Sequence, residues 1–194
     1  MTRPHDRLLG RVRDLGHGGE GVVETDRGIV FVPGTLPGER IRLALTRKKS
    51  GALRGRLLEV LDAAPERVEP SCELASECGG CPLMILDRDA QRAHKAGVAS
   101  WATGIDTGVS RPGPVLAYRR RARFAFGGGR LGYRHGRRSS LLDVEACSVL
   151  EPPLSVALAR VRKDLLPVLS GAGELLMARG RRAPVVWARS EDAQ

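Results

Sequence analysis

The first sixty residues of the chain alternate between apolar and polar positions with a period of two. The clearest case is the segment 40–46, where Ile41, Leu43 and Leu45 are separated by polar or small residues. Such alternation is typical of a strand with one buried face. Similar short segments lie at 8–15, 21–24, 28–32 and 53–61, with Gly, Pro and Asp in the turns between them. Short strands at this spacing predict a small β-barrel of the OB type.

A different pattern follows residue 62. The segment 63–71 contains Pro65 and Pro70 and predicts an extended linker. Asp87 is a suitable N-cap for a helix. The apolar side of that helix would comprise Ala90, Ala93, His94, Gly97, Val98 and Trp101.

The remainder of the chain predicts antiparallel strands and one more helix. Strands are expected at 118–126 and 130–134, joined by three glycines, and again at 174–178 and 184–188. A helix is expected after Pro152 and Pro153, with Pro167 ending it. Its apolar face would comprise Leu154, Leu158, Val161 and Leu165. The predicted fold class is α+β, with an OB-like barrel at 1–62, a linker at 63–71 and an α+β domain at 72–194.

The net charge of the chain indicates which class of molecule it binds. Lys and Arg number 32 against 22 Asp and Glu, which gives a formal net charge of +10. A surface this basic attracts polyanions, most simply nucleic acid, unless the genome favours arginine in every protein. The arginines are clustered, however, because residues 111–142 contain nine Arg and no Asp or Glu. We therefore expect a nucleic acid as the partner.

The sequence gives no sign of a membrane or an export signal. It contains no run of 18 apolar residues, and its polar first residues lead into no apolar segment. We therefore expect a cytoplasmic protein without membrane contact. In that reducing compartment, cysteines are more often metal ligands than disulfide partners.

The four cysteines are spaced as one set of metal ligands. Cys72, Cys78 and Cys81 lie within one loop, and Cys147 lies far downstream. Structural zinc sites usually have two C-x2-C pairs, of which this chain has one, whereas an iron–sulfur cluster accepts three clustered ligands and a remote one. By spacing alone, an iron–sulfur cluster, zinc and four unconnected thiols all stay open. A four-thiolate cluster would be closed and would stabilise the fold.

The segment 118–126 places arginines and aromatic residues on opposite faces of one predicted strand. Tyr118, Ala122, Phe124 and Phe126 would lie on one face, and Arg119, Arg121 and Arg123 on the other. Guanidinium groups ~6.6 Å apart along a strand approximate the phosphate repeat of a single strand of nucleic acid. The alternative is a solvated face whose charge is paired with acids from elsewhere.

Further basic residues and one ring complete the predicted RNA contacts. Tyr133 offers a ring that would stack on a base. The other predicted contacts are Arg120, Arg130, Arg134, Arg137, Arg138, Lys48 and Lys49. The segment Gly16–Gly21 matches G-x-G-x-x-G, but strand-like residues follow it where a dinucleotide site needs a helix, so we interpret it as a barrel turn.

These features together resemble the bacterial RNA (uracil-C5) methyltransferases. The N-terminal part resembles a TRAM domain, and the cysteine loop with its Gly79-Gly80 is similar to the cluster motif of the family. The segments 118–124, 131–134 and 143–147 match the family's next motifs, so the resemblance extends from about Leu8 to the last strand. It implies a 4Fe-4S cluster on Cys72, Cys78, Cys81 and Cys147. It also implies RNA contacts from the barrel and the arginine strand, and S-adenosylmethionine chemistry on a uridine of rRNA or tRNA.

The sequence departs from the family in its catalytic part. Family members continue into a C-terminal methyltransferase domain, and their reaction needs a cysteine thiolate that attacks the uracil ring. All four cysteines here are assigned to the cluster, and no strand–glycine turn–helix pattern is present to hold S-adenosylmethionine. We therefore expect an RNA-binding N-terminal portion without catalytic residues, with the C-terminal domain expected in a full-length form. A stand-alone RNA-binding protein and a zinc-stabilised nucleic-acid-binding module are the alternatives.

Overall fold

The computed structural model describes residues 7–46, 52–134 and 140–190. The chain divides into two compact units. The first comprises Met1–Ser76 and Cys81–Arg111, and the second comprises Glu77–Gly80 and Pro112–Gln194. The chain therefore passes from one unit to the other on either side of the short segment Glu77–Gly80, inside the cysteine loop.

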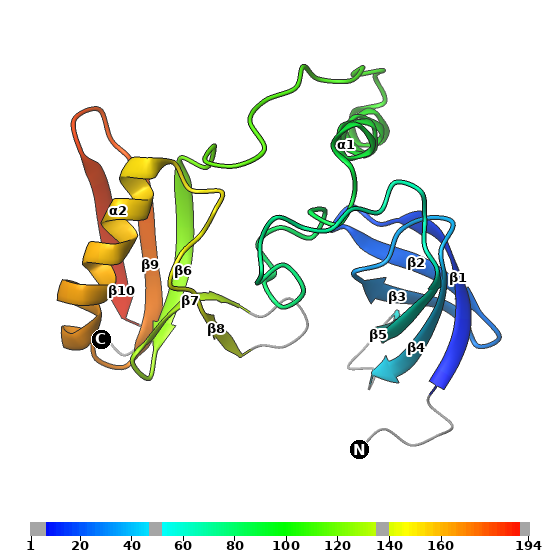
Figure 1. The fold of residues 1–194 in the computed structure, drawn as a ribbon, viewed down its shortest axis with the longest axis horizontal. Helices are drawn as coiled ribbons and strands as arrows, with labels where there is room; N and C mark the ends of the chain where they lie inside the picture. The colour runs from blue at the N-terminus through cyan, green and yellow to red at the C-terminus, as the bar shows by residue number, and fades with distance from the viewer. Residues whose placement is uncertain (1–6, 47–51, 135–139, 191–194) are drawn as a thin grey trace. The chain divides into compact units, whose positions relative to one another are not determined.

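The first unit contains a closed five-stranded β-barrel (Figure 1). Its strands are β1 (Arg7–Leu15), β2 (Glu20–Thr25), β3 (Gly28–Pro33), β4 (Arg40–Thr46) and β5 (Leu53–Asp62), in the order β1-β2-β3-β5-β4. The β3–β5 pair is parallel. Alternating apolar residues such as Val23, Ile41 and Leu43 fill the barrel and are fully buried. The small β-barrel predicted by the period of two is confirmed.

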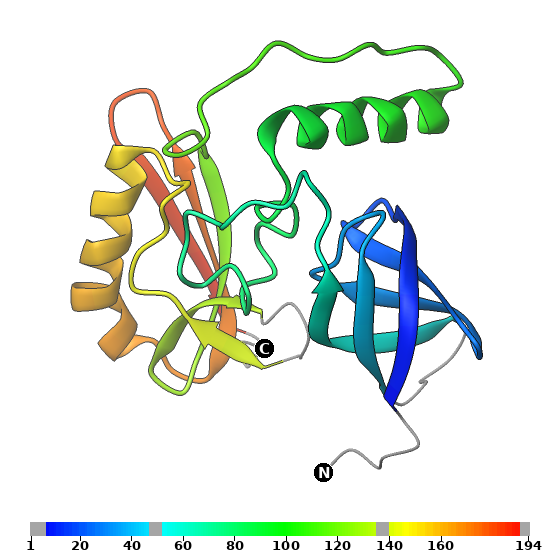
Figure 2. The same cartoon turned by 45° about the vertical axis from the view of Figure 1, so that its right-hand side comes forward.

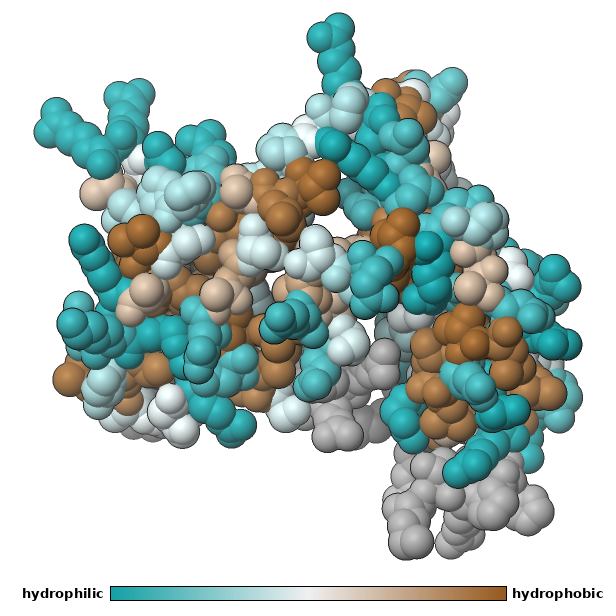
Figure 3. Space-filling model, in the orientation of Figure 1, coloured by the Kyte–Doolittle hydropathy of each residue, from teal (hydrophilic) through white to brown (hydrophobic). Residues whose placement is uncertain are grey.

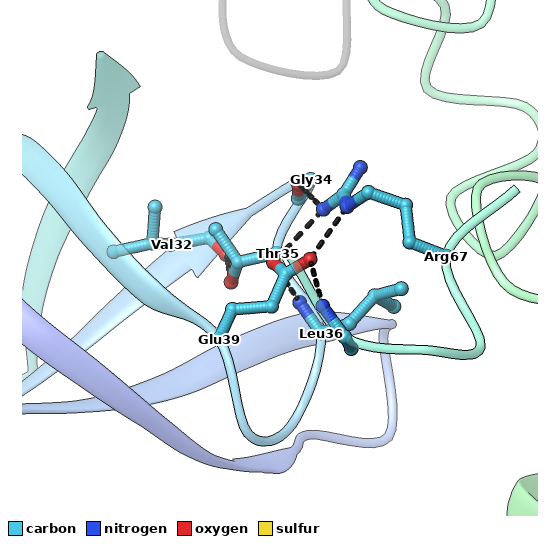
Figure 4. Close-up of polar contacts among 7 residues, drawn as sticks. Val32, Gly34, Thr35, Leu36, Glu39 and Arg67 are labelled. Atoms are coloured by element: carbon cyan, nitrogen blue, oxygen red, sulfur yellow. Dashed lines mark hydrogen bonds and ion pairs between the residues drawn. The ribbon is translucent and has the colours of Figure 1, made fainter. Parts of the chain in front are cut away.

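The predicted linker packs on the barrel. Ala64 is buried in a cluster with Leu15, Leu36 and Leu86. Glu39, which is 0% exposed, accepts hydrogen bonds from the Arg67 guanidinium at 2.5 and 2.9 Å and from the Leu36 amide at 2.8 Å (Figure 4).

This buried pair moves the boundary of the packed unit. A buried carboxylate needs a cation and hydrogen-bond donors, and Arg67 supplies the cation from inside the predicted linker. Arg67 also donates to the Gly34 carbonyl at 2.9 Å. The first unit thus continues past the boundary predicted at residue 62 and reaches Arg111. The predicted extents of the RNA-binding domains stay a prediction.

Helix α1 (Arg88–Thr103) begins where the sequence predicted. The Asp87 side chain accepts from the amides of Asp89 and Ala90 at 2.8 and 3.1 Å, which confirms it as the N-cap. The predicted apolar side is wrong as a buried face, since no residue of α1 is buried and Trp101 is 74% exposed. Half of that side is Ala or Gly, which offers little apolar area for packing.

The second unit is built on a five-stranded antiparallel sheet. Its strands are β6 (Arg121–Gly127), β7 (Arg130–Arg134), β8 (Leu141–Asp143), β9 (Ala172–Arg179) and β10 (Pro184–Ser190), in the order β10-β9-β6-β7-β8. Helix α2 (Pro152–Arg160) continues as a π-helical turn at Val161–Leu165 and a 3-10 turn at Leu166–Val168.

Helix α2 covers one face of this sheet (Figure 2). Leu154 and Leu158 of α2 pack against Phe124, Leu175 and Met177 of the sheet. The mixed α+β fold with its barrel and second antiparallel sheet is therefore confirmed. Strand β8 was not predicted, because three residues are too few to display a period.

Strand β6 begins three residues later than predicted. The Arg119 amide donates to the Val149 carbonyl at 2.6 Å, and the Glu151 amide donates to the Arg119 carbonyl at 3.1 Å. Ala117 has a φ of 54°, in the left-handed region, immediately before this segment. Tyr118, predicted to share a face with Phe124 and Phe126, is 44% exposed, whereas both phenylalanines are buried. The backbone thus pairs with the start of α2 before it enters the sheet.

Hydrophilic side chains cover most of the face drawn in Figure 3, and hydrophobic groups are exposed in patches among them. Large exposed apolar side chains occur in both units, among them Leu9, Trp101 and Trp187. Among the residues that the structure describes, no helix is long and apolar enough to cross a membrane.

Candidate nucleic-acid interface and cysteine loop

Strand β6 separates its basic side chains from its apolar ones. Ala122, Phe124 and Phe126 are buried beneath α2. Arg121 and Arg123 are exposed on the opposite face. The alternation predicted for this strand is thus confirmed from Arg121 onward, and it directs the guanidinium groups away from the core.

Carboxylates neutralise the arginines of this face only in part. The Arg123 Nη1 atom lies 4.0 Å from the Glu174 Oε1 atom, and Arg120 Nε lies 3.4 Å from Glu151 Oε1. Within the described ranges, Arg121, Arg130 and Arg134 form no ion pair. The alternative of a paired, solvated face therefore holds only weakly, for Arg123, since Arg120 pairs with the residue before α2 and lies outside β6.

The Arg119 side chain contacts the cysteine loop. Its Nη2 atom donates to the Gly80 carbonyl at 3.0 Å. A Cβ atom added at Gly80 would lie 3.3 Å from the Cys78 Sγ atom and 3.7 Å from the Arg119 Nη1 atom, so the space for a side chain there is small. The predicted RNA contact of Arg119 stays a prediction, and its observed contact positions the loop.

Tyr133 lies at the edge of the core. Its ring centroid is 4.8 Å from that of Phe124, and its hydroxyl is 3.9 Å from the Cys147 Sγ atom. Burial, and then the nearby Cys147, raise the pKa of the Tyr133 phenol far above its ordinary value. Because one face of the ring is packed on Phe124, this placement favours a structural role beside Cys147 over stacking on a base.

None of the four cysteines forms a disulfide bond in the described part of the chain, and each is partly buried. Cys78 and Cys147 belong to the second unit, whereas Cys72 and Cys81 belong to the first. The Gly80 amide donates to the Cys78 Sγ atom at 3.3 Å, a contact that stabilises a thiolate ligand. The chemistry of the donor set fits a four-thiolate metal group.

The four thiols are divided between the two units, two in each. Among the residues that the structure describes, no three Cys, His, Asp or Glu side chains meet in an arrangement that would hold a metal ion. The predicted cluster on Cys72, Cys78, Cys81 and Cys147 therefore stays a prediction, as does the structural role predicted for it.

An arginine that the sequence analysis missed positions the segment before Cys147. Arg162 Nη1 and Nη2 donate to the two Asp143 carboxylate oxygens at 2.8 and 3.0 Å. Arg162 also donates to the carbonyls of Leu131 and Val144 at 3.0 and 3.2 Å. The hydrogen bond from Arg162 lowers the pKa of Asp143, and the same bond raises the pKa of Arg162. No sequence motif singled out Arg162. In the structure it lies in a π-helical turn, a feature often found at functional sites.

Four of the predicted RNA contacts lie outside the described residues. These are Lys48 and Lys49, which follow β4 in the sequence, and Arg137 and Arg138, which follow β7. They stay predictions.

Comparison with known proteins finds relatives that this chain matches over part of their length. No family model matches the chain. It is 38% identical over 167 residues to a 23S rRNA (uracil(1939)-C(5))-methyltransferase RlmD of Chromohalobacter salexigens, covering 80% of this chain and 35% of that protein. It is 32% identical over 203 residues to the RlmD protein of Pectobacterium carotovorum, covering 97% of this chain and 45% of that protein.

A solved structure shares the fold. The crystal structure of Pyrococcus abyssi tRNA (uracil-54, C5)-methyltransferase in complex with S-adenosyl-L-homocysteine superposes with a TM-score of 0.66 at 20% identity. The match covers 96% of this chain and 46% of that one. The chain thus spans less than half the length of each of these proteins. By sequence, it belongs to the bacterial S-adenosylmethionine-dependent RNA (uracil-C5) methyltransferase family.

Proposed function

We propose that this chain is an RNA-binding portion of a uracil-C5 methyltransferase that acts on rRNA or tRNA. The observation that carries the proposal is the exposed arginine face of the second sheet, where Arg121, Arg130 and Arg134 have no carboxylate partner among the described residues. The printed names of the relatives, which are 23S rRNA and tRNA uracil-C5 methyltransferases, support RNA as the polyanion.

The physical basis of the proposal is phosphate recognition. A guanidinium group is always charged and binds phosphate oxygens through two parallel hydrogen bonds. Each phosphate that it neutralises releases condensed counterions, which favours binding at low salt. A rigid sheet holds several such groups at fixed spacing, and α2 leaves their face uncovered because it packs on the opposite side.

RNA binding and methyl transfer are assigned to different parts of the protein. Uracil-C5 methylation needs a nucleophilic thiolate and a base. We assign these groups and the S-adenosylmethionine site to the part of the relatives that this chain does not match. Here Arg121 and Arg123 bind and orient the RNA, and the barrel adds contacts through Lys48 and Lys49.

We also propose that Cys72, Cys78, Cys81 and Cys147 hold a 4Fe-4S cluster with a structural role. The cluster would supply thiolate–iron bonds between segments that are distant in sequence. Residues near two of the thiols support this: the Gly80 amide hydrogen-bonds to Cys78 and the Tyr133 hydroxyl lies beside Cys147. The Arg162–Asp143 pair would hold the Cys147 segment in place.

Salt-dependent RNA binding tests the main proposal. The full chain is titrated against a labelled single-stranded RNA over a range of KCl concentrations, and affinity is measured by fluorescence anisotropy. We expect Arg121→Ala with Arg123→Ala to reduce the log–log salt slope by about 1.4, at about 0.7 per lost phosphate contact. Arg13→Ala with Arg42→Ala is the matched control, because both residues are ion-paired in the barrel. Equal slopes for the two double variants contradict the proposal.

Metal analysis tests the cluster. Protein purified without oxygen is expected to contain iron and acid-labile sulfide and to show the visible absorption of an iron–sulfur centre. Cys147→Ser is expected to lower the iron content, whereas Trp101→Phe, in the exposed part of α1, is not. Zinc without sulfide favours the zinc-stabilised module, and absence of any metal rules out both.

A further inference from the structure

The face of the second sheet opposite α2 is arranged in rows across three strands. Arg123 of β6 lies opposite Leu176 of β9, which lies opposite Trp187 of β10. In the next row Arg121 lies opposite Ala178, which lies opposite Val185. Directly paired residues point to the same side of a sheet, and Leu175 and Met177 point toward α2. Arg121, Arg123 and Trp187 therefore share the face that α2 leaves open.

Trp187 is exposed on this face. Its side chain is 53% exposed, and Leu176 between it and Arg123 is 38% exposed. A large indole on an open sheet face has few packing partners, so its ring is accessible to a planar ligand. The spacing of neighbouring strands is about 4.8 Å, so the Trp187 and Arg123 backbones are about 10 Å apart.

The charged residues on the sheet face opposite α2 indicate which class of ligand it binds. Arg121 and Arg123 lie on one side of the apolar row, and Arg189 lies on β10 two residues beyond Trp187. Glu174, opposite both Ala125 and Arg189, is the acidic residue of β9 on this side. An aromatic ring flanked by arginines matches a ligand that has planar bases and phosphates, and it does not match an acidic or apolar protein surface equally well.

We propose that this face binds single-stranded RNA, with Trp187 stacking on one unpaired base and Arg123 holding a neighbouring phosphate. The proposal rests on RNA being the partner of the chain and specifies which form of RNA the sheet accepts. Bases in a duplex are already stacked on both sides, so an indole stacks on bases of loops, bulges and ends. The role predicted for Tyr133 thus falls to Trp187, whose ring is exposed.

The fluorescence of Trp187 tests the proposal in the full chain. The protein has two tryptophans, so Trp101→Phe leaves Trp187 as the only emitter. This variant is titrated with a single-stranded oligouridine and with a blunt RNA duplex of equal length, and labelled RNA reports total binding by anisotropy. We expect saturable quenching by the single strand, at the affinity given by anisotropy, and little quenching by the duplex.

Substitution at Trp187 supplies the second measurement. Trp187→Ala is expected to weaken single-strand binding by about 5- to 150-fold, the range for loss of one base–aromatic stack, while Trp187→Phe retains most of it. Thermal unfolding checks that both variants are folded. The position is on an edge strand and partly solvated, so both are expected to unfold near the parent.

The outcomes separate this proposal from the general function. If the chain binds RNA but Trp187 emission does not change and Trp187→Ala binds as well as the parent, stacking on Trp187 is ruled out. RNA binding by the chain then still stands. Absence of RNA binding in every variant overturns both. If Trp187 emission changes when the protein is diluted without RNA, a second copy of the chain covers this face. That outcome also rules out stacking of RNA on Trp187.

Discussion

The barrel and the second sheet both carry arginines on their strands, yet the two sets differ in what lies beside them. On the barrel, four guanidinium groups pair with carboxylates carried by other strands. These pairs are Arg13–Glu24 at 3.1 Å, Arg40–Asp62 at 2.9 Å, Arg54–Glu20 at 2.6 Å, and Arg42–Glu59. On β6 and β7, the described residues provide no such partner for Arg121, Arg130 or Arg134.

The strand register accounts for two of the four barrel pairs and for the difference from the second sheet. In the barrel, Arg40 lies opposite Asp62 and Arg42 lies opposite Glu59. In the sheet, the residues opposite Arg121 and Arg123 are Ala178 and Leu176. Opposite charges across a strand pair attract, whereas an apolar neighbour leaves the guanidinium to solvent or a ligand. The barrel residues 7–46 and 52–62 hold eight Arg and seven Asp or Glu, whereas residues 119–134 hold six Arg and no acid. A polyanion is therefore attracted mainly to the second unit.

The largest effect is expected where a carboxylate of the barrel is buried. Glu39→Ala leaves the Arg67 guanidinium and the Leu36 amide without their acceptor. We expect a loss of about 3–5 kcal/mol in the free energy of unfolding of the first unit, as for other broken buried pairs. Urea unfolding followed by circular dichroism measures it. Glu24→Ala, in a pair whose side chains are 65% and 54% exposed, is the matched control and is expected to cost less than about 1 kcal/mol.

The half-buried Arg162–Asp143 pair of the second unit is expected to show a smaller, pH-dependent effect. Asp143→Asn is expected to destabilise that unit by on the order of 1–2 kcal/mol at neutral pH, because the carboxylate is partly exposed. The pKa of Asp143 is lowered in the folded state, so the pair stabilises above the unfolded pKa of about 3.9, and this contribution is lost as the pH falls through the lower folded pKa.

Urea midpoints between pH 2 and pH 6 test this dependence. The difference between the parent and Asp143→Asn is expected to shrink as the pH falls below about 4. A difference that stays constant over this range shows that the pair does not act through the charge of Asp143.

Removing the surface acids of the barrel tests the comparison directly. Glu20→Gln, Glu24→Gln and Glu59→Gln together leave Arg54, Arg13 and Arg42 without their carboxylates. We expect RNA affinity to rise by roughly 5- to 30-fold at low salt and the salt slope to steepen, since three more guanidinium groups become available. Anisotropy measures both. If affinity does not change, cross-strand neutralisation is not what limits the RNA contacts of these three barrel arginines.

The smallest effect is expected at the one acid beside Arg123. Glu174→Gln removes a carboxylate 4.0 Å from the Arg123 guanidinium. We expect RNA to bind roughly two- to five-fold more tightly at low salt, and the gain to disappear at high salt, where exposed charges are screened. Weaker binding in this variant indicates that Glu174 orients Arg123 for the RNA.

Local patterns predicted the elements well and the packing less well. The strands of the barrel, the N-cap at Asp87 and the alternation along β6 follow from residue order, because each depends on neighbours within a few positions. The apolar side of α1 is not buried, and Tyr118 is exposed where Phe124 is buried, because burial depends on what another segment places against a residue. The cysteine set was identified by spacing, and its assembly stays a prediction.

The sequence by itself determined which residues share a face of each strand and helix, and it determined the cluster of arginines between residues 111 and 142. Only the tertiary structure decided which strands lie side by side. That choice paired the barrel arginines with carboxylates, packed Tyr133 on Phe124, and set the exposed Trp187 in a row with Arg123. The physical reason is that charge pairing and burial act between atoms close in space, whereas the period of a sequence specifies only direction along one element.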